Sequence, residues 1–256
     1  MELFDTHCHL DVEAFAPDRE QVLSDSRAAG VRHLLIPAIR RAGWDSLWEL
    51  CESDDQLYPA IGLHPVMLDQ HQDADVEALD EFVRRYRPVA IGEIGLDYFV
   101  KTLDRQRQQQ LLEAQLSIAE KQRLPVVLHV RKAHDPMLQT LKRFNLVGGT
   151  CHAFNGSRQQ ADRYIDMGFK LGFGGMLTYP NANKLHALAK TLPLDSIVLE
   201  TDSPDMVGAE HRYQRNSPAY LPEVLETLAS LRGISAEELA MITTENGIQA
   251  LGLTSS

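Results

Sequence analysis

The stretch LFDTHCHL, residues 3–10, joins a short apolar run to two closely spaced histidines. Seven further apolar runs of similar length follow it along the chain, and longer amphipathic stretches separate most of them. Strands that alternate with helices are typical of βαβ units, which build a parallel sheet. The eight runs, which we predict to be strands, cover residues 3–10, 32–39, 57–65, 88–97, 124–130, 148–154, 168–175 and 196–202.

Eight strand–helix units in 256 residues match the usual size of a (β/α)8 TIM barrel. We therefore predict an α/β fold of this type, regular or distorted, in one domain over residues 1–256. A doubly wound open sheet is the competing architecture, but no GxGxxG follows the first run, which removes its commonest nucleotide-binding version. Helix-end signals support the pattern, since Gly30 has the place of a helix C-cap and Ser235 with Glu238 has capping-box spacing.

Composition narrows the functional classes. The formal net charge of −11 argues against a protein that coats DNA with a basic surface, although an enzyme can still meet nucleic acid at one local site. No apolar run approaches the roughly 18 residues that a membrane-spanning helix needs. The three cysteines show no CxxC spacing, and the first residues do not resemble a secretory signal. We expect a cytoplasmic protein with no membrane association and no obligate protein partner.

Polar side chains interrupt the apolar runs near their carboxyl ends. His7 and His9 are two residues apart, so in a strand both side chains would point to one face and Cys8 would point away into the packing. In a TIM barrel the carboxyl ends of the strands form the mouth in which active sites are built. The interrupting residues are His7, His9, His64, Glu93, His129, His152 and Asp202.

Six of these residues predict a metal centre. Burying so many ionisable groups in one mouth costs free energy unless they are paired or bind an ion. Imidazole and carboxylate are common ligands of divalent metal ions, and six of them suit two ions about 3.5–4 Å apart that share a bridging carboxylate. We leave the identity of the ions open among Zn, Mn, Mg, Co and Ni. The predicted ligands are His7, His9, Glu93, His129, His152 and Asp202.

The roles of the other polar residues stay open at this level. His64 is a metal neighbour, a phosphate donor or a structural hydrogen bonder. Arg131 shares the face of a predicted ligand two residues before it and is placed to bind a phosphate with its guanidinium, whereas Lys132 would point away. Arg158 and Tyr179 are weaker candidates for substrate contact. We interpret most of the remaining histidines as solvated or capping residues, with His134 nearest the rim; they are His33, His71, His134, His186 and His211.

Several of these motifs resemble those of the TatD family of metal-dependent hydrolases, which belongs to the amidohydrolase-like barrels. The resemblance runs in order from residue 5 to about residue 252. IGEIGLD and LETDSP are its most specific segments, whereas HxH is shared by the wider superfamily. The matching motifs are DTHCHLD, GLHP, IGEIGLDYF, LPVVLHVRKAHD, HAFNGS, LETDSPD and RNSPAYL with ITTEN.

This resemblance implies a distorted TIM barrel with a divalent metal centre at the same six positions. It assigns Glu93 as the carboxylate that bridges the ions and Asp202 as the residue that orients or deprotonates the attacking water. It also implies a deoxyribonuclease that acts on DNA ends in the 3′ to 5′ direction or cleaves phosphodiester bonds more broadly, with DNA as a transient partner. Val130 and Asn155 depart from the family pattern, which often has a serine at the first position and a serine or threonine at the second.

Two other functions remain open at this stage. The first is metal-assisted hydrolysis of a small amide, lactone or phosphoester, which the net charge of −11 mildly favours. The second is a non-catalytic binding protein, which the intact set of six predicted ligands argues against. A count of bound metal separates this last class from the enzymes, and substrate turnover separates the two enzymes.

Overall fold

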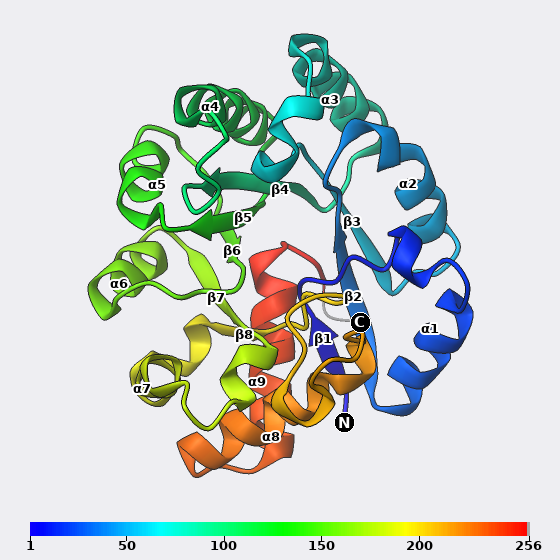
Figure 1. Cartoon of the computed structure of the whole chain (residues 1–256), viewed down its shortest axis with the longest axis vertical. Coiled ribbons are helices and arrows are strands. Elements are labelled where there is room, and N and C mark those ends of the chain that lie inside the picture. The colour runs from blue at the N-terminus through cyan, green and yellow to red at the C-terminus, as the bar shows by residue number, and fades with distance from the viewer. Residues whose placement is uncertain (255–256) are drawn as a thin grey trace.

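The computed structural model describes residues 1–254 of the chain. Within this part, eight strands form one parallel sheet in chain order, and Figure 1 shows them as a ring with helices on the outside. The predicted (β/α)8 barrel is confirmed. The strands are β1 (Leu3–Asp5), β2 (Val31–Pro37), β3 (Leu57–Ile61), β4 (Ala90–Asp97), β5 (Val126–Arg131), β6 (Gly149–Cys151), β7 (Phe169–Phe173) and β8 (Ile197–Leu199).

Backbone hydrogen bonds just beyond the regular strands join the two ends of the sheet. The N–H of Thr6 donates to the carbonyl of Leu199 (3.0 Å), and the N–H of Asp202 donates to the carbonyl of His7 (2.8 Å). The N–H of His9 donates to the carbonyl of Ser203 at 2.8 Å. This seam holds the segment that follows β1 beside the segment that follows β8, and both segments carry predicted ligands.

Each strand is followed by at least one α-helix in the described chain, as the predicted βαβ pattern requires. Gly30 follows the first helix with a φ of +90°. The hydroxyl of Ser235 accepts the N–H of Glu238 at the start of the last helix, which confirms Ser235 as its N-cap and gives one of the two hydrogen bonds of the predicted capping box. The helices are α1 (Arg19–Ala28), α2 (Trp44–Glu52), α3 (Asp73–Tyr86), α4 (Arg105–Gln122), α5 (His134–Leu141), α6 (Arg158–Asp166), α7 (Asn183–Thr191), α8 (Leu221–Arg232) and α9 (Ala236–Ala250).

Several strands are shorter than the apolar runs from which we predicted them. β1 ends at Asp5 and β8 at Leu199, so His7, His9 and Asp202 lie in the segments after these strands. The alternation argument within a strand was therefore wrong for the two histidines. Their placement comes instead from the seam between β1 and β8, which turns both imidazoles toward the barrel mouth.

Apolar side chains fill the barrel below its mouth. The members of this cluster come from five strands and from the residue that directly follows α9. Helix α9 itself packs against β8 and β1. All members of the cluster are buried, so the mouth rests on a dry apolar floor. They are Phe4, Leu35, Ala60, Ala90, Val127 and Leu251.

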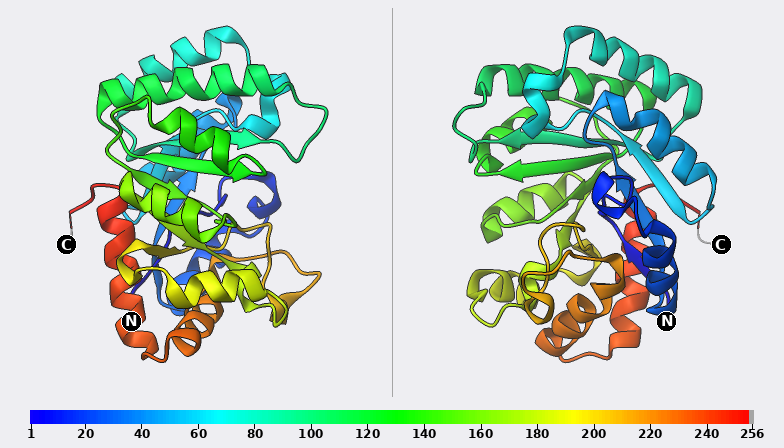
Figure 2. Two further views of the ribbon diagram at one scale, coloured as in Figure 1. Left: turned by 90° about the vertical axis from the view of Figure 1, so that its left-hand side faces the viewer. Right: turned by 45° about the vertical axis from the view of Figure 1, so that its right-hand side comes forward.

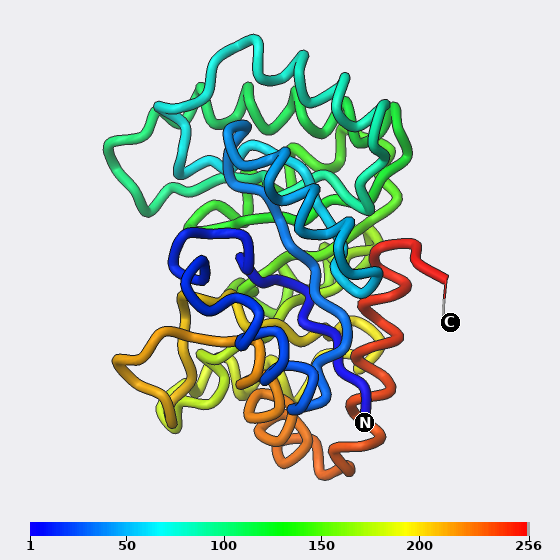
Figure 3. The backbone as a smooth tube through the Cα atoms, turned by 90° about the vertical axis from the view of Figure 1, so that its right-hand side faces the viewer, coloured from blue at the N-terminus to red at the C-terminus, as the bar shows by residue number. Residues whose placement is uncertain are grey.

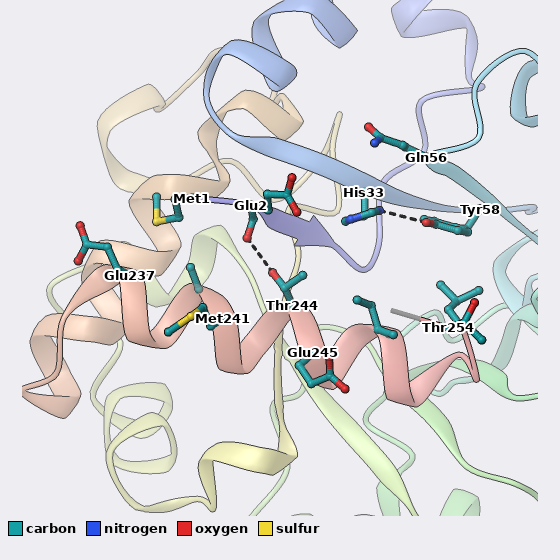
Figure 4. A pocket seen from close by; sticks show the side chains of 13 residues that line it. Met1, Glu2, His33, Gln56, Tyr58, Glu237, Met241, Thr244, Glu245 and Thr254 are labelled. Atoms are coloured by element: carbon teal, nitrogen blue, oxygen red, sulfur yellow. Dashed lines mark hydrogen bonds between the residues drawn. The ribbon is translucent and has the colours of Figure 1, made fainter. Parts of the chain in front are cut away.

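The end of the barrel opposite the mouth carries a separate hollow that contains none of the predicted ligands. In Figures 2 and 3 the N-terminus and the end of the red helix α9 lie at the end opposite the gold segment 203–218, which rises from the mouth. The hollow has a volume of about 660 Å³ and lies beside α9 (Figure 4). There His33 pairs with Tyr58 (3.0 Å), and Thr244 donates to the carbonyl of Glu2 (3.0 Å). In TIM barrels this end contributes to stability rather than to catalysis.

No helix within residues 1–254 is long and apolar enough to cross a membrane.

Candidate metal centre

Glu93 lies in the middle of the barrel mouth, on β4, with 1% of its surface exposed. Its Oε2 is 3.1 Å from Nε2 of His7 and 3.5 Å from Nε2 of His9. Asp202 approaches the same two rings, since its Oδ1 lies 3.6 Å from each of the two Nε2 atoms. The side chains of His7, His9 and Asp202 form the first donor group, on one side of the Glu93 carboxylate.

A second donor group faces the other oxygen of Glu93. Oε1 lies 2.9 Å from Nδ1 of His129 and 3.0 Å from Nε2 of His152. His129 lies on β5, and His152 directly follows β6. The ring of His64 also approaches Oε1, with its Nε2 at 3.1 Å. The structure thus brings all six predicted ligands together, and each oxygen of Glu93 faces a different donor group.

The spacing and chemistry of these donors fit divalent ions. Donor atoms bound about 2.0–2.1 Å from one tetrahedral ion lie about 3.3 Å from one another. The contacts between Glu93 or Asp202 and the rings of His7, His9, His129 and His152 range from 2.9 to 3.6 Å. Among residues 1–254, three sets of potential donors lie within 4.8 Å of one another: His7 with Glu93 and His152, His7 with His9 and Asp202, and His64 with Glu93 and His129.

The outer nitrogens of two rings are held in the way that metal-binding histidines require. Nδ1 of His9 donates to the carbonyl of Pro37 (3.1 Å), because a carbonyl can only accept. Nε2 of His129 donates to Oδ2 of Asp97 (3.0 Å), a carboxylate that also accepts two backbone N–H groups. When either ring is neutral, as a metal-bound histidine must be, its opposite nitrogen therefore carries a lone pair that faces Glu93. A lone pair aimed at a carboxylate oxygen calls for a cation between them.

His64 differs from the other rings because its Nδ1 accepts the backbone N–H of Val66 (3.0 Å). The proton of the neutral ring must then lie on Nε2, which donates to Oε1 of Glu93. Burial lowers the pKa of His64 to about 4, so the ring is neutral near pH 7. This geometry favours a ring that orients Glu93 over a ring that binds an ion.

Protonation of the metal-free centre follows from its crowded carboxylates. Burial opposes the charge on His152, but Glu93 and Asp202 outweigh it and raise the pKa of His152 to about 10. Burial likewise opposes charge on His9, and the bond to Glu93 raises its pKa to about 9. Burial alone would raise the pKa of Glu93, but the surrounding imidazoles hold it well below its usual value. Protons thus occupy places that a divalent cation would take.

The centre opens into a cavity of about 760 Å³, which His9, His64, Glu93, His129, His152 and Asp202 help to line. Arg131 lines it too, with its guanidinium 3.8 Å from the ring of the half-exposed Phe99. A side cavity of about 230 Å³ shares Asn155 and Met176 with the main one and is mostly apolar.

Some predicted residues lie elsewhere. Arg158 pairs with Asp162 (2.7 Å) on α6, and the hydroxyl of Tyr179 donates to the carbonyl of Val207 (3.1 Å). Neither of these two candidates lines the cavity within the described chain.

Two histidines that we interpreted as solvated or capping residues are in fact buried. His71 donates from Nε2 to the carbonyl of His64 (2.9 Å). His134 contacts the hydroxyl of Tyr164 (3.2 Å) and the side chain of Asn155 (3.3 Å). The partners of His134 lie 21 and 30 residues away along the chain, which explains why its local sequence gave no sign of burial.

Three buried carboxylates around the centre escaped the sequence prediction. Asp97 pairs with His129, Glu200 lies behind His152, and Asp5 accepts the backbone N–H groups of His7 (3.2 Å) and Thr201 (2.9 Å). Each stands in the same apolar run as a predicted ligand. A carboxylate that shares an apolar run with a predicted ligand could therefore have been identified from the sequence as a possible partner of that ligand.

Comparison with known proteins agrees with this geometry. A family model described as TatD related DNase matches residues 4–252. The metal-dependent hydrolase YjjV of Escherichia coli K12, named as uncharacterized, is 42% identical over 246 residues, which cover 94% of this chain and 95% of that protein. A Salmonella typhimurium protein named 3′-5′ ssDNA/RNA exonuclease TatD is 31% identical over 251 residues, which cover 95% of this chain and 96% of that one.

Solved structures show the same similarity. The crystal structure of YjjV, a TatD homologue from Escherichia coli K12, superposes with a TM-score of 0.94 at 39% identity and covers 98% of each chain. A TatD family hydrolase from Entamoeba histolytica matches with a TM-score of 0.85 at 22% identity, over 97% of this chain and 98% of that one, which supports the fold alone.

Proposed function

This chain belongs to the TatD family of metal-dependent hydrolases, and we propose that it cleaves phosphodiester bonds at the 3′ ends of single-stranded DNA. The observation that carries the proposal is the position of Glu93 between two groups of histidines in an open cavity. The printed name of the Salmonella relative supports a nucleic-acid substrate.

We assign the six predicted ligands to two ions. His7, His9 and Asp202 would hold one ion with Oε2 of Glu93. His129 and His152 would hold the other with Oε1 of Glu93. Bound divalent ions lower the pKa of coordinated water and stabilise negative charge on phosphoryl oxygens.

Asp202 is the proposed general base. Its side chain lines the cavity and is 14% exposed, so it can reach a water molecule there. Burial raises the pKa of Asp202 above its ordinary value, and a base with a higher pKa accepts a proton more readily. The hydrogen bond from His64 holds the Glu93 carboxylate in place while the proton moves.

Arg131 is the proposed phosphate-binding residue. It is exposed, lines the same cavity as the ligands and rests on Phe99, which limits the conformations that its guanidinium samples. Val66, Phe99 and Met176 are large apolar side chains that remain exposed on segments that follow β3, β4 and β7. Such side chains suit contact with the unpaired bases of a single strand.

The test uses protein stripped of metal with a chelator and a single-stranded DNA oligomer labelled at its 5′ end. Mg²⁺, Mn²⁺, Zn²⁺ or no metal is then added, and products are resolved by length. We expect a metal-dependent ladder that shortens from the 3′ end, with weaker cleavage of blunt duplex DNA. An RNA oligomer of the same sequence tests whether the enzyme distinguishes ribose from deoxyribose.

An Asp202→Asn protein purified in parallel excludes a contaminating nuclease, since it should give no ladder. The proposal fails if the wild-type protein cleaves no oligomer with any metal. Turnover of a small phosphodiester, lactone or amide under those conditions would assign the chain to the alternative class of small-substrate hydrolases.

A further inference from the structure

Two buried polar atoms behind the metal centre lack hydrogen-bond partners among residues 1–254. They are Nδ1 of His152 and Oε2 of Glu200. His152 is 6% exposed and Glu200 is 1% exposed, so both atoms are shielded from bulk solvent. An unpaired buried polar atom costs free energy, and here a potential donor and a potential acceptor lie on neighbouring side chains.

The Glu200 carboxylate is held against the His152 side of the barrel. Its Oε1 accepts the backbone N–H of Ala153 (2.5 Å) and lies 3.8 Å from Nδ1 of His152. The backbone N–H of Glu200 donates to the carbonyl of Phe173 (3.1 Å). A shift of about 1 Å would bring this carboxylate within ordinary hydrogen-bond distance of the ring.

The neighbouring strand leaves room for this carboxylate. A Cβ built on Gly172 of β7 would lie only 2.0 Å from Oε2 of Glu200. Any side chain at position 172 would therefore displace the carboxylate from its place behind the ring. The absence of a side chain at Gly172 therefore allows the Glu200 carboxylate to lie behind the His152 ring.

His129 offers a direct parallel on the same side of Glu93. Its outer nitrogen donates to Asp97 (3.0 Å), while its inner nitrogen faces Oε1 of Glu93 (2.9 Å). His152 has the same arrangement, with Nε2 at 3.0 Å from Glu93 and Nδ1 toward Glu200. Both histidines of the second donor group thus have a buried carboxylate behind them.

We propose that Glu200 is a positioning residue that accepts a hydrogen bond from Nδ1 of His152 and so keeps the lone pair of Nε2 directed at the metal. The inference rests on the two-ion centre proposed above. Carboxylate partners of this kind fix the tautomer and the orientation of a metal-binding ring, and their loss lowers metal affinity about 10–100-fold. The effect should fall on the ion held by His129 and His152.

The experiment measures metal binding, not turnover. Zn²⁺ is titrated into metal-free wild-type protein and into Glu200→Leu, Glu200→Gln and Thr150→Val variants in competition with a chromophoric chelator. Thr150→Val is the matched control, because Thr150 is a buried residue of β6 whose hydroxyl also lacks a partner in the described chain. We expect Glu200→Leu to weaken one of two sites about 10–100-fold, Glu200→Gln to weaken it less, and Thr150→Val to change neither.

Nitrogen-15 NMR of the zinc-loaded wild-type protein provides a second test that needs no variant to fold. We expect a proton on Nδ1 of His152 and none on Nε2. The inference is overturned if Nδ1 lacks the proton, or if a folded Glu200→Leu protein binds both ions as tightly as wild type or loses affinity equally at both sites. A wild-type protein that binds no zinc would instead contradict the proposed centre itself.

Discussion

His64 donates a hydrogen bond from Nε2 to Oε1 of Glu93, 3.1 Å away, because its Nδ1 already accepts the backbone N–H of Val66. The ring therefore orients the Glu93 carboxylate, which we propose to bridge two ions, and both of its own nitrogens are engaged in hydrogen bonds. It shares Oε1 with His129 and His152, so the hydrogen bond also limits how far that oxygen can move toward either ring. This relationship separates the role of His64 from that of the predicted ligands.

We predict that His64→Ala lowers the hydrolysis rate about 10–100-fold and leaves the metal content at wild-type level. The physical reason is loss of a proton donor that fixes Glu93. Metal content is measured by elemental analysis beside the rate. His33→Ala is the matched control, since His33 lies at the far end of the barrel. Loss of a full equivalent of metal from His64→Ala would show that His64 is a ligand instead.

Replacing Asp202 tests its assignment as the general base. Asp202→Asn should lower kcat about 10²–10⁴-fold, because the amide cannot accept a proton, while most of the bound metal is retained. Asp205→Asn, in the same loop and also lining the cavity, should leave kcat nearly unchanged. Full activity of Asp202→Asn would remove Asp202 from the mechanism.

Glu93 should couple metal binding to the stability of the fold. Ions that bind only the folded protein stabilise it by RT ln(1 + [L]/Kd), about 2.7 kcal/mol at a free concentration of 100 times Kd. We predict that Zn²⁺ raises the Tm of the wild-type protein and that Glu93→Gln reduces this increase strongly. Differential scanning calorimetry with and without chelator measures it. An equal increase in both proteins would exclude Glu93 as a shared ligand.

The pKa values of the metal-free centre predict how metal binding depends on pH. His9 and His152 have pKa values of about 9 and about 10, so both carry protons at pH 7 that bound metal must displace. Zinc binding at pH 7 should therefore release protons, and the apparent affinity should rise toward pH 10. Calorimetric titration in buffers with different ionisation enthalpies measures the release. Binding without proton release would contradict these assignments.

The same shifts set the sign of the effect on stability. Both folded-state pKa values lie above the unfolded value of 6.5, so the two imidazolium groups stabilise the metal-free protein fully below pH 6.5. That contribution is lost as the pH rises through 9 and 10. Metal-loaded protein should not show this loss, because its rings are already unprotonated. Denaturant unfolding across this pH range compares the two forms.

Arg131 should contribute to substrate binding more than its neighbour Lys132 does. Arg131 lines the cavity and Lys132 does not, so Arg131→Gln should raise KM for single-stranded DNA about 10-fold with little change in kcat. Lys132→Gln, which removes the same charge one residue away, should have a smaller effect. Equal effects of the two variants would show that Arg131 contributes only nonspecific electrostatic attraction to DNA and does not bind a particular phosphate.

Much of the fold was predictable from the sequence because every strand overlaps one of the eight mainly apolar runs. The eight runs gave the number and order of the strands, since a parallel barrel connects neighbouring strands in chain order. The strand ends were less predictable. His7 and Asp202 continue apolar runs in sequence, but the seam between β1 and β8 sets their backbone, and Asp202 has a φ of +57°.

Residues around the predicted ligands were harder to identify. Asp97 and Glu200 stand near strand ends beside apolar residues, as the predicted ligands do, so one sequence cannot separate a ligand from the partner of a ligand. His64 is ambiguous for the same reason, and only the contact of its Nδ1 with Val66 separates the alternatives. Tautomers depend on three-dimensional partners, which residue spacing does not reveal.

The central claim is that Glu93 lies between two divalent ions. Crystals of the zinc-loaded protein, measured on both sides of the zinc absorption edge, give an anomalous difference map that locates each ion. We predict two peaks about 3.5–4 Å apart, one beside His7, His9 and Asp202 and one beside His129 and His152. A map with no peak at Glu93, or with zinc bound only outside the barrel mouth, would contradict the account.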